Sequence, residues 1–468
     1  MDVLTTTLAL CFLMLVAYRG YSVILFAPVA ALLAVLFQGP ALVPPMFSGV
    51  FMEKLVGFLK PYFPVFLLGA LFGKLIELSG FARAITERVI RYLGRNNAML
   101  AVVVVCALLT YGGVSLFVAA FAVYPFAAEL YKAAGIPKRL IPGTIALGSF
   151  TFTMDALPGS PQIQNIIPTT FFHTTTWAAP KLGLIGAAFV LASGLFYLTW
   201  RRRLAAAAGE GYGDEGAATA AAAAPGPGGD KLPHPLLAFL PLILVGVVNL
   251  LLTRAIPNAF PKMFDFTKVG VTGVAALDVS KLVALWAVEG ALLCGILTIV
   301  VTALPRVRVN FASGTNLAIA GALLAAFNTA SEYGFGGVIA ALPGFRVIAD
   351  WLSHGISDPL LSAAVTTTIL AGITGSASGG MSIALAAMGQ QYLEQATQRG
   401  IAPEVLHRVA AMASGGMDTL PHNGAVITLL AVTGLTHRQS YRDIFAMTLI
   451  KTTAVFVVIG FFYVFHIY

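Results

Sequence analysis

The chain has 468 residues, of which 58% are hydrophobic and 10% are charged, and its mean hydropathy is +0.87. A soluble protein carries roughly 25% charged residues, so this composition excludes a soluble globular domain and indicates a polytopic membrane protein. The net charge of +8 does not indicate nucleic-acid binding, because the basic residues gather at the ends of apolar runs, as topology signals do. The three cysteines each lie in an apolar run, which argues against a metal site or disulfide framework: Cys11, Cys106 and Cys294.

Ten apolar runs of spanning length occur along the chain, and we expect a membrane helix from each. They cover residues 3–18, 21–37, 62–80, 140–172, 181–200, 235–253, 279–303, 316–342, 409–435 and 444–466. The first run lacks a basic leader and a small-residue cleavage site, so we interpret it as a retained helix and not as a signal peptide.

Two further apolar runs, 98–131 and 360–395, carry glycine and serine at their centres, in "TYGGVSLF" and "TGSASGGMSIAL". Each run is long enough for two half-helices but too short for two full crossings with a loop. We therefore predict two re-entrant hairpins, whose turns are tolerated at membrane depth where protein or a wet cavity covers them.

Two of the predicted helices contain an interruption. In "TFTMDALPGSP" (151–161), Pro158 and Pro161 remove backbone donors and block the helix, and Gly159 permits a turn. The segment "GGMDTLPHNG" (415–424) has the same pattern in the helix predicted at 409–435. The sequence therefore predicts two helices that are broken near the middle of the membrane.

The two halves of the chain share an order of motifs, which indicates an internal duplication. "GGVS" and "GGMS" in the hairpins and "MDALP" and "MDTLP" at the interruptions recur at an offset of 263 to 267 residues. Between the halves, the Ala/Gly/Pro-rich segment 201–234 predicts a flexible cytoplasmic linker. Five spans in each half make the second half inverted, and basic clusters place the first hairpin on the cytoplasmic side.

Broken helices within inverted repeats are typical of secondary transporters. The free N–H groups of each downstream half-helix, and of the hairpin arms that we expect to begin near Ser115 and Ser382, favour a small anion. The candidate substrate-binding residues are Gly112, Gly113, Ser115, Ser160, Gln162, Gln164, Asn165, Ser378, Gly379, Gly380, Ser382, Thr419, His422 and Asn423. Gln164 and Asn165 have an alternative role in satisfying backbone groups freed by Pro161.

Asp155 and Asp418 at the two interruptions are the candidate proton-coupling residues, together with His422 and Glu332. A carboxylate at membrane depth is functional by default. If one aspartate is protonated when an anion binds, proton and anion movement are coupled. The alternatives are that each aspartate caps its downstream half-helix, that His422 is a hydrogen-bonded core residue, and that Glu332 belongs to a structural pair.

Other charged residues in the apolar runs carry weaker hypotheses. Glu289 has no neighbouring motif, so we expect a packing or interface partner for it. Lys74 and Lys451 lie nearer the ends of their predicted spans, where lysine side chains extend to the membrane surface.

The segments "FTMDALPGSPQIQNIIPTTFF" (152–172) and "AYRGYSVILFAPVAALLA" (17–34) resemble the gluconate permease (GntP) family of the ion transporter superfamily. "ALPGSPQIQN" (156–165) is similar to the D-beta-hydroxybutyrate permease branch, and the histidine- and proline-rich segment of the sugar-acid branch is replaced here. The resemblance implies proton-coupled uptake of a small hydroxy-carboxylate across a bacterial inner membrane. It also implies a homodimer whose transport domain moves like an elevator against a scaffold.

Mapped onto this chain, the resemblance implies seven ranges. The scaffold would comprise 1–61, 173–200, 235–315 and 436–468, and the linker 201–234. The transport domain would comprise 62–172, with hairpin 98–131 and broken helix 140–172, and 316–435, with hairpin 360–395 and broken helix 409–435.

The sequence thus predicts an all-α polytopic membrane protein that transports 3-hydroxybutyrate or a gluconate-like acid with protons, without a cofactor or metal and without enzymatic activity. Sodium-coupled or exchange transport of another carboxylate or a D-amino acid is the main alternative. The hairpins lack the Ser-Asn-Thr tips of sodium-coupled relatives, which argues against two standard sodium sites. An intramembrane aspartyl enzyme and a passive anion channel are the other classes, and the aspartates lack a glycine-flanked catalytic signature.

Overall fold

The computed structural model describes residues 2–19, 21–94, 97–114, 116–213, 232–345, 347, 356–421 and 423–468. Its first ten helices are α1 (Asp2–Tyr18), α2 (Val23–Gln38), α3 (Val43–Pro45), α4 (Met52–Leu78), α5 (Phe81–Leu93), α6 (Ala98–Tyr111), α7 (Leu116–Ala133), α8 (Ile141–Ser149), α9 (Phe152–Asp155) and α10 (Ile163–Phe172). The later helices are α11 (Pro180–Ala207), α12 (Pro235–Ala259), α13 (Val283–Val307), α14 (Phe311–Ala341), α16 (Pro359–Thr374), α17 (Ala377–Gln398), α18 (Pro403–Gly415), α19 (Gly424–Thr433) and α20 (His437–Phe465).

The long apolar helices overlap six of the ten predicted spans, namely 62–80, 181–200, 235–253, 279–303, 316–342 and 444–466, and the first of them begins at Pro40 and not at 62. Five stretches of the described chain are long and apolar enough to cross a membrane: Pro40–Leu78, Pro180–Ala207, Pro235–Ala259, Val283–Ala341 and His437–Phe465. α11, α12, α16 and α18 each have a proline at the start, where its missing N–H costs no helical hydrogen bond. The predicted helical character of the chain is confirmed.

Both predicted hairpins are present. α6 and α7 pack against each other around a turn at Gly113, and α16 and α17 pack against each other around a turn at Gly375. The φ angles of these glycines are 98° and 69°, in the positive region that glycine adopts without a steric cost. A Cβ at Gly380 would lie 2.0 Å from the Cα of Ala371, so the arms of the second hairpin touch through bare backbone. The second arm begins at Ala377, before the predicted Ser382.

Both helix interruptions are also present. The first separates α9 from α10, and Gly159 adopts a φ of 78° there. The second consists of the short 3₁₀ turn η9 (Gly416–Thr419) and the residues before α19. Prolines 158 and 421 follow the two Asp-x-Leu triplets, so the local chemistry of the two breaks is the same.

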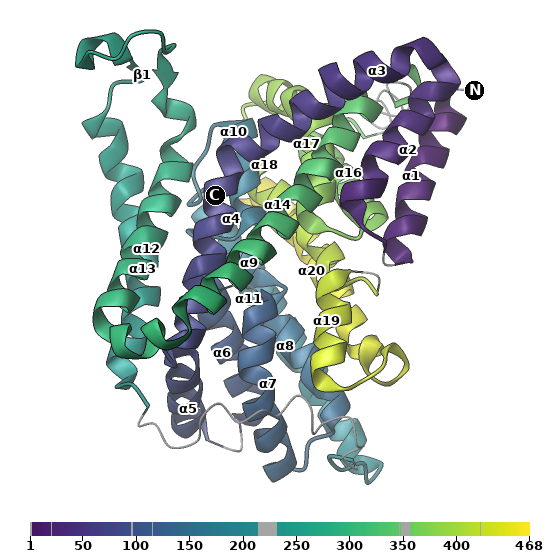
Figure 1. Ribbon diagram of the computed structural model, residues 1–468. Helices are drawn as coiled ribbons and strands as arrows, with labels where there is room; N and C mark the ends of the chain where they lie inside the picture. The colour runs from purple at the N-terminus through teal and green to yellow at the C-terminus, as the bar shows by residue number, and fades with distance from the viewer. Residues whose placement is uncertain are drawn as a thin grey trace.

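Figure 1 shows how the long helices surround these broken elements. α14 packs along α4, and the α12–α13 pair stands at one side of the molecule against α4. The "GFGG" run of α14 (334–337) permits this close approach, because a Cβ at Gly337 would meet the Lys54 side chain at 2.5 Å. Among the described residues the only strands are β1 (Met263–Phe264) and β2 (Leu277–Asp278), antiparallel in the loop between α12 and α13.

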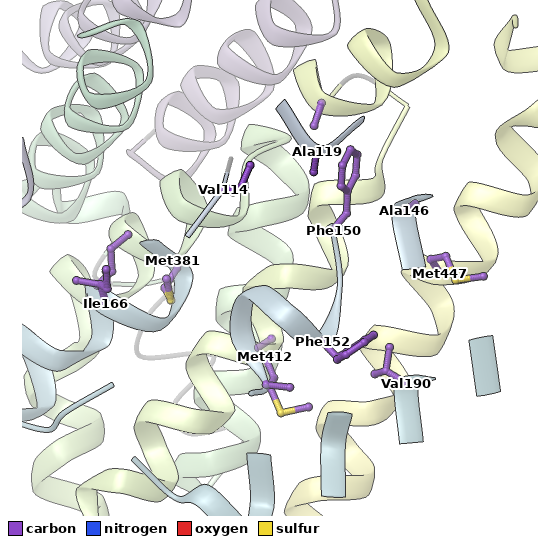
Figure 2. Packing of buried hydrophobic residues seen from close by; sticks show 14 of the residues in the cluster. Val114, Ala119, Ala146, Phe150, Phe152, Ile166, Val190, Met381, Met412 and Met447 are labelled. Carbon is purple, nitrogen blue, oxygen red and sulfur yellow. The ribbon is translucent and has the colours of Figure 1, made fainter. Parts of the chain in front are cut away.

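α11 and α20, which the resemblance assigns to the scaffold, pack against each other and against the interrupted helices α8, α9 and α18. Figure 2 shows Phe152 of α9, Val190 of α11 and Met412 of α18 converging in this part of the core. The interrupted helices, the hairpins, α11 and α20 therefore form one packed group.

Two loops of the predicted topology are partly helical. The arginine-rich segment before the first hairpin forms the amphipathic helix α5, and α11 extends to Ala207, inside the predicted linker. Of the linker, only 208–213 and 232–234 beyond α11 belong to the described residues.

Candidate functional site

Asp155 and Lys451 form an ion pair where the first interruption meets the middle of α20. Both side chains are buried, with 1% and 2% exposure. A Cβ at Gly415 would come within 1.7 Å of Asp155 Oδ2 and 2.1 Å of Lys451 Nζ, so the pair lies on the bare backbone at the end of α18. Because desolvation offsets most of the attraction in a buried pair, stability alone does not account for these charges.

Asp418 joins the second interruption to the other broken elements. Its Oδ1 accepts hydrogen bonds from the Ala377 backbone N–H at 3.0 Å and from Asn423 Nδ2 at 3.3 Å, and its Oδ2 accepts from Gln164 Nε2 at 3.0 Å. The next residue, Thr419, places its hydroxyl 2.6 Å from that of Thr448, one turn before Lys451 in α20. Since Ala377 begins α17, one carboxylate ties the tip of the second hairpin to both interruptions.

Two residues of α18 hold the backbone of the first interruption. The buried Arg408 guanidinium donates to Asp155 O at 2.5 Å, to Ala178 O at 2.7 Å and to Asn165 Oδ1 at 3.1 Å. His407 Nε2 lies 3.2 Å from the same Asn165 oxygen, and its Nδ1 lies 2.6 Å from a threonine hydroxyl. Because the amide oxygen can only accept, Nε2 is a donor, and the threonine hydroxyl can donate to Nδ1 or accept from it.

The tip of the first hairpin is fastened to the first interruption. Gln162 Nε2 donates to Thr110 O at 2.6 Å, and the Tyr111 hydroxyl donates to Pro158 O at 2.8 Å. A Cβ at Gly113 would lie 3.4 Å from the ring of the neighbouring Pro161. Each hairpin tip therefore rests on the interruption of its own half of the chain.

Glu332 of α14 faces the first turn of α17. A Cβ at Gly379 would lie 1.6 Å from Glu332 Oε2, so the carboxyl group lies directly on the helix backbone. That oxygen is buried and has no hydrogen-bond partner among the described residues. Ser376 caps the helix by accepting from the Gly379 N–H at 3.1 Å, and the hydroxyls of Ser378 and Thr329 lie 3.4 Å apart.

Comparison with known proteins places this site in a transporter. No known family model matches the chain. The uncharacterized transporter YxjC of Bacillus subtilis (strain 168) is 58% identical over 464 residues, which cover 98% of each chain. The chain belongs to the YxjC family of transporters. The YdaH transporter of Alcanivorax borkumensis, whose crystal structure shows an unusual topology, is similar in fold, with a TM-score of 0.50, 16% identity and coverage of 89% of this chain and 88% of that one.

Membership of the YxjC family agrees with the predicted transporter class. The names of these relatives give no substrate and no coupling ion. The resemblance to gluconate permeases therefore stays a prediction.

In this YxjC-family chain, the structure brings a subset of the predicted residues together. Asp155, Asp418, Gln164 and Asn423 meet at the two interruptions, and Glu332 lies at the adjoining end of α17. Gly379 and Ser378 lie in the first turn of that helix, and Gln162 and Gly113 lie at the first hairpin tip. Ser115 and His422 lie outside the described residues.

Other predicted substrate residues are engaged in internal hydrogen bonds. The Ser160 hydroxyl donates to Thr153 O at 2.7 Å, and the Ser382 hydroxyl donates to Ser378 O one turn earlier in α17 at 2.7 Å. The Thr419 hydroxyl lies 2.6 Å from that of a threonine in α20. These three hydroxyls are satisfied within the fold.

The remaining predicted residues pack or hold backbone. Asn165 Nδ2 donates to two carbonyl oxygens across the break, each at 2.9 Å, as the alternative interpretation expected. A Cβ at Gly112 would meet Leu242 of α12 at 2.3 Å, and Gly380 lies on the first arm of its hairpin. These positions require small or amide side chains for packing.

The capping alternative for the aspartates is wrong as it was framed. The cap of α19 is Asn423, whose Oδ1 accepts from the Ala425 N–H at 2.7 Å, while Asp418 accepts from Ala377 of α17. At the start of α10 no side chain caps the helix, and Asp155 pairs with Lys451. Both aspartates act between elements and not within their own half-helices.

Lys451, Arg408 and His407 are missing from the predicted site. α20 begins at His437, so Lys451 lies at its centre and not near its end. The capping box of Thr436 and Gln439 is the sequence signal for that start. α18 likewise begins at Pro403, so this helix includes His407 and Arg408. The predicted span begins at 409 and excludes both residues.

Proposed function

We propose that this protein is a secondary active transporter of the bacterial cytoplasmic (inner) membrane that takes up a small hydroxy-monocarboxylate together with protons. 3-Hydroxybutyrate is the first candidate and a gluconate-like acid the second. The observation that carries the proposal is the buried cluster of Asp155, Lys451 and Asp418, where both interruptions and one hairpin tip meet.

An anionic substrate is supported by the helix ends around this cluster. Gln164 lies in the first turn of α10, Asn423 caps α19, and Ala377 begins α17. The partial positive charge of helix N-termini attracts anions, most strongly where water is scarce. Lys451 adds a full positive charge at the same place.

Proton coupling is supported by charge balance. Asp155, Asp418, Lys451 and Arg408 together carry no net charge when all four are ionised. A substrate carboxylate then adds one negative charge in an apolar environment, which costs several kcal/mol unless a proton enters with it.

An elevator movement is implied by the resemblance to gluconate permeases. The hairpins, the interrupted helices, α11 and α20 form a first group and α4, α12 and α13 a second, while α14 packs both on α4 and on α17 of the second hairpin. Asn249 of α12 crosses between the groups, donating to Gly159 O at 3.1 Å. We propose that the first group moves against the second and that the second forms the contact in a homodimer.

The test is uptake of labelled 3-hydroxybutyrate and gluconate by proteoliposomes under an imposed inward proton gradient without sodium. We expect saturable accumulation against the substrate gradient. Asp155→Asn and Asp418→Asn should lose dependence on the proton gradient, and Asp278→Asn, in the surface loop before α13, should retain it. Accumulation that needs a sodium gradient and ignores the proton gradient would refute proton coupling. Equilibration without accumulation would indicate a channel.

A further inference from the structure

Among the residues that the structure describes, Lys451 is a lysine buried in the core. On the basis of the proposed function, we infer that Lys451 binds the substrate carboxylate and that Asp155 and this carboxylate compete for the Lys451 ammonium. Before substrate binds, the ammonium pairs with Asp155. When a substrate carboxylate takes the ammonium, Asp155 accepts one proton from water, and the reverse occurs on release.

The ammonium of Lys451 has more N–H donors than it has hydrogen-bond acceptors among the described residues. It carries three N–H groups, and among the described residues its hydrogen-bond partners are Asp155 Oδ2 and, at 3.4 Å, the carbonyl oxygen of Phe150. Lys451 is 2% exposed, so its remaining donor has no bulk water to bind. A second carboxylate is the acceptor that best satisfies it.

Asp155 is the aspartate that can give up its charge. Its Oδ1 is buried without a hydrogen-bond partner among the described residues, and its Oδ2 depends on Lys451. Asp418, in contrast, accepts three hydrogen bonds that favour its ionised form. When the substrate occupies Lys451, the Asp155 carboxylate loses its hydrogen-bond donor among the described residues, so it binds a proton.

The charged groups around Asp155 leave this role to Lys451. Arg408 of α18 donates to the Asp155 backbone carbonyl and not to its carboxylate, and His407 beside it is engaged by Asn165. Asp418 of η9 is engaged by its own donors, Ala377 N–H, Asn423 Nδ2 and Gln164 Nε2. The Tyr111 hydroxyl of α6 donates to a backbone carbonyl, and the Glu332 carboxyl of α14 lies on α17.

Gln164 supplies the group that distinguishes a hydroxy acid from a simple carboxylic acid. Its Nε2 is held by Asp418, which turns its Oε1 away from that carboxylate, and Oε1 is buried without a partner among the described residues. In the inferred complex, this unpaired Gln164 oxygen accepts a hydrogen bond from the hydroxyl group of the substrate. A carboxylate lacking the hydroxyl leaves this oxygen unpaired, which reduces its binding.

The experiment measures binding to the purified full-length protein by calorimetry, with 3-hydroxybutyrate, gluconate, lactate and butyrate as probes. Titration in buffers of different ionisation enthalpy gives the number of protons taken up. In the wild type we expect one proton per carboxylate and a Kd that rises about tenfold per pH unit where Asp155 is ionised. In Asp155→Asn we expect no proton uptake and a Kd independent of pH.

The double variant Asp155→Asn/Lys451→Gln removes both charges of the pair and so avoids a stranded buried ion. It should fold and bind the carboxylates at least about 100-fold more weakly, while Lys281→Gln on the surface loop should bind as the wild type does. Gln164→Met should reduce the preference for 3-hydroxybutyrate over butyrate about tenfold. Proton uptake that persists in Asp155→Asn, or a wild-type Kd in the double variant, would overturn the inference alone. A wild type that binds none of the four probes would overturn the proposed substrate class as well.

Discussion

Asp418 and Asn423 both hold the tip of the second hairpin, and removing the Asp418 carboxylate should loosen that tip selectively. Asp418→Ala leaves two buried donors without an acceptor, the Ala377 N–H and Gln164 Nε2, which are each 3.0 Å from the carboxylate. Asn423 keeps its stronger hydrogen bond to Gly375 O at 2.7 Å. A stranded buried donor costs about 1–3 kcal/mol, and removal of the buried charge offsets part of the sum. We expect a net local loss of about 2–3 kcal/mol.

Asp418→Asn should have a smaller effect, because Gln164 can rotate its amide. Its Oε1 has no partner among the described residues, so after rotation it can accept from the new side-chain amide. The substituted oxygen still accepts from Ala377. We expect a loss of about 1 kcal/mol.

The assay is amide hydrogen exchange in nanodiscs, read on peptides covering residues 372–382. A loss of 2–3 kcal/mol raises local exchange about 30- to 150-fold, and about 1 kcal/mol raises it about fivefold. Peptides from the first hairpin tip, residues 108–114, should be unchanged, as should both tips in Asp278→Ala, which removes a carboxylate that caps a surface turn. If Asp418→Ala is folded and the second tip exchanges at the wild-type rate, the carboxylate does not hold the hairpin.

Two further variants test other contacts. Gly415→Ala places a methyl group where Asp155 Oδ2 lies, so it should break the buried ion pair. We expect this variant to lose about 3–5 kcal/mol of stability in thermal unfolding and to lose uptake. The control Gly460→Ala has open space around its new methyl group and should keep both stability and uptake. Outside the membrane segments, hydrogen bonding to Arg139 lowers the pKa of Glu210, so this exposed pair stabilises the protein above the usual glutamate pKa and loses its effect as the pH falls below it. The unfolding temperature of Glu210→Gln should therefore lie slightly below the wild type at pH 7 and coincide with it near pH 3, because an exposed pair contributes less than about 1 kcal/mol. Equal unfolding temperatures at both pH values would contradict a role for this pair.

The sites of the helix interruptions follow from local chemistry. Pro158 and Pro161 cannot continue a helix, and Gly159 adopts the positive φ that the turn requires. Glycine pairs in apolar runs likewise predicted both hairpin turns. Such features depend on a few adjacent residues, so the linear sequence contains the information they need.

The starts of two helices differ from the sequence prediction, and the difference affects the interpretation of Lys451 and Arg408. The apolar pattern predicts that the last span starts at 444 and the second interrupted helix at 409. In the structure, polar first turns extend α20 back to His437 and α18 back to Pro403. The apolar pattern alone therefore places Lys451 near a helix end and Arg408 outside any span. Hydropathy alone does not detect a polar first turn, whereas capping residues and an initial proline do.

The sequence alone determined that the chain is a mostly helical membrane protein with two hairpins and two broken helices, because hydropathy, proline and glycine act over short distances. It also marked Asp155 and Asp418 as charges in apolar segments. Only the tertiary structure decided that Asp155 pairs with Lys451, 296 residues away, and that Asp418 binds the tip of the second hairpin. Pairing of buried charges depends on which helices pack together, and that is set by the whole fold.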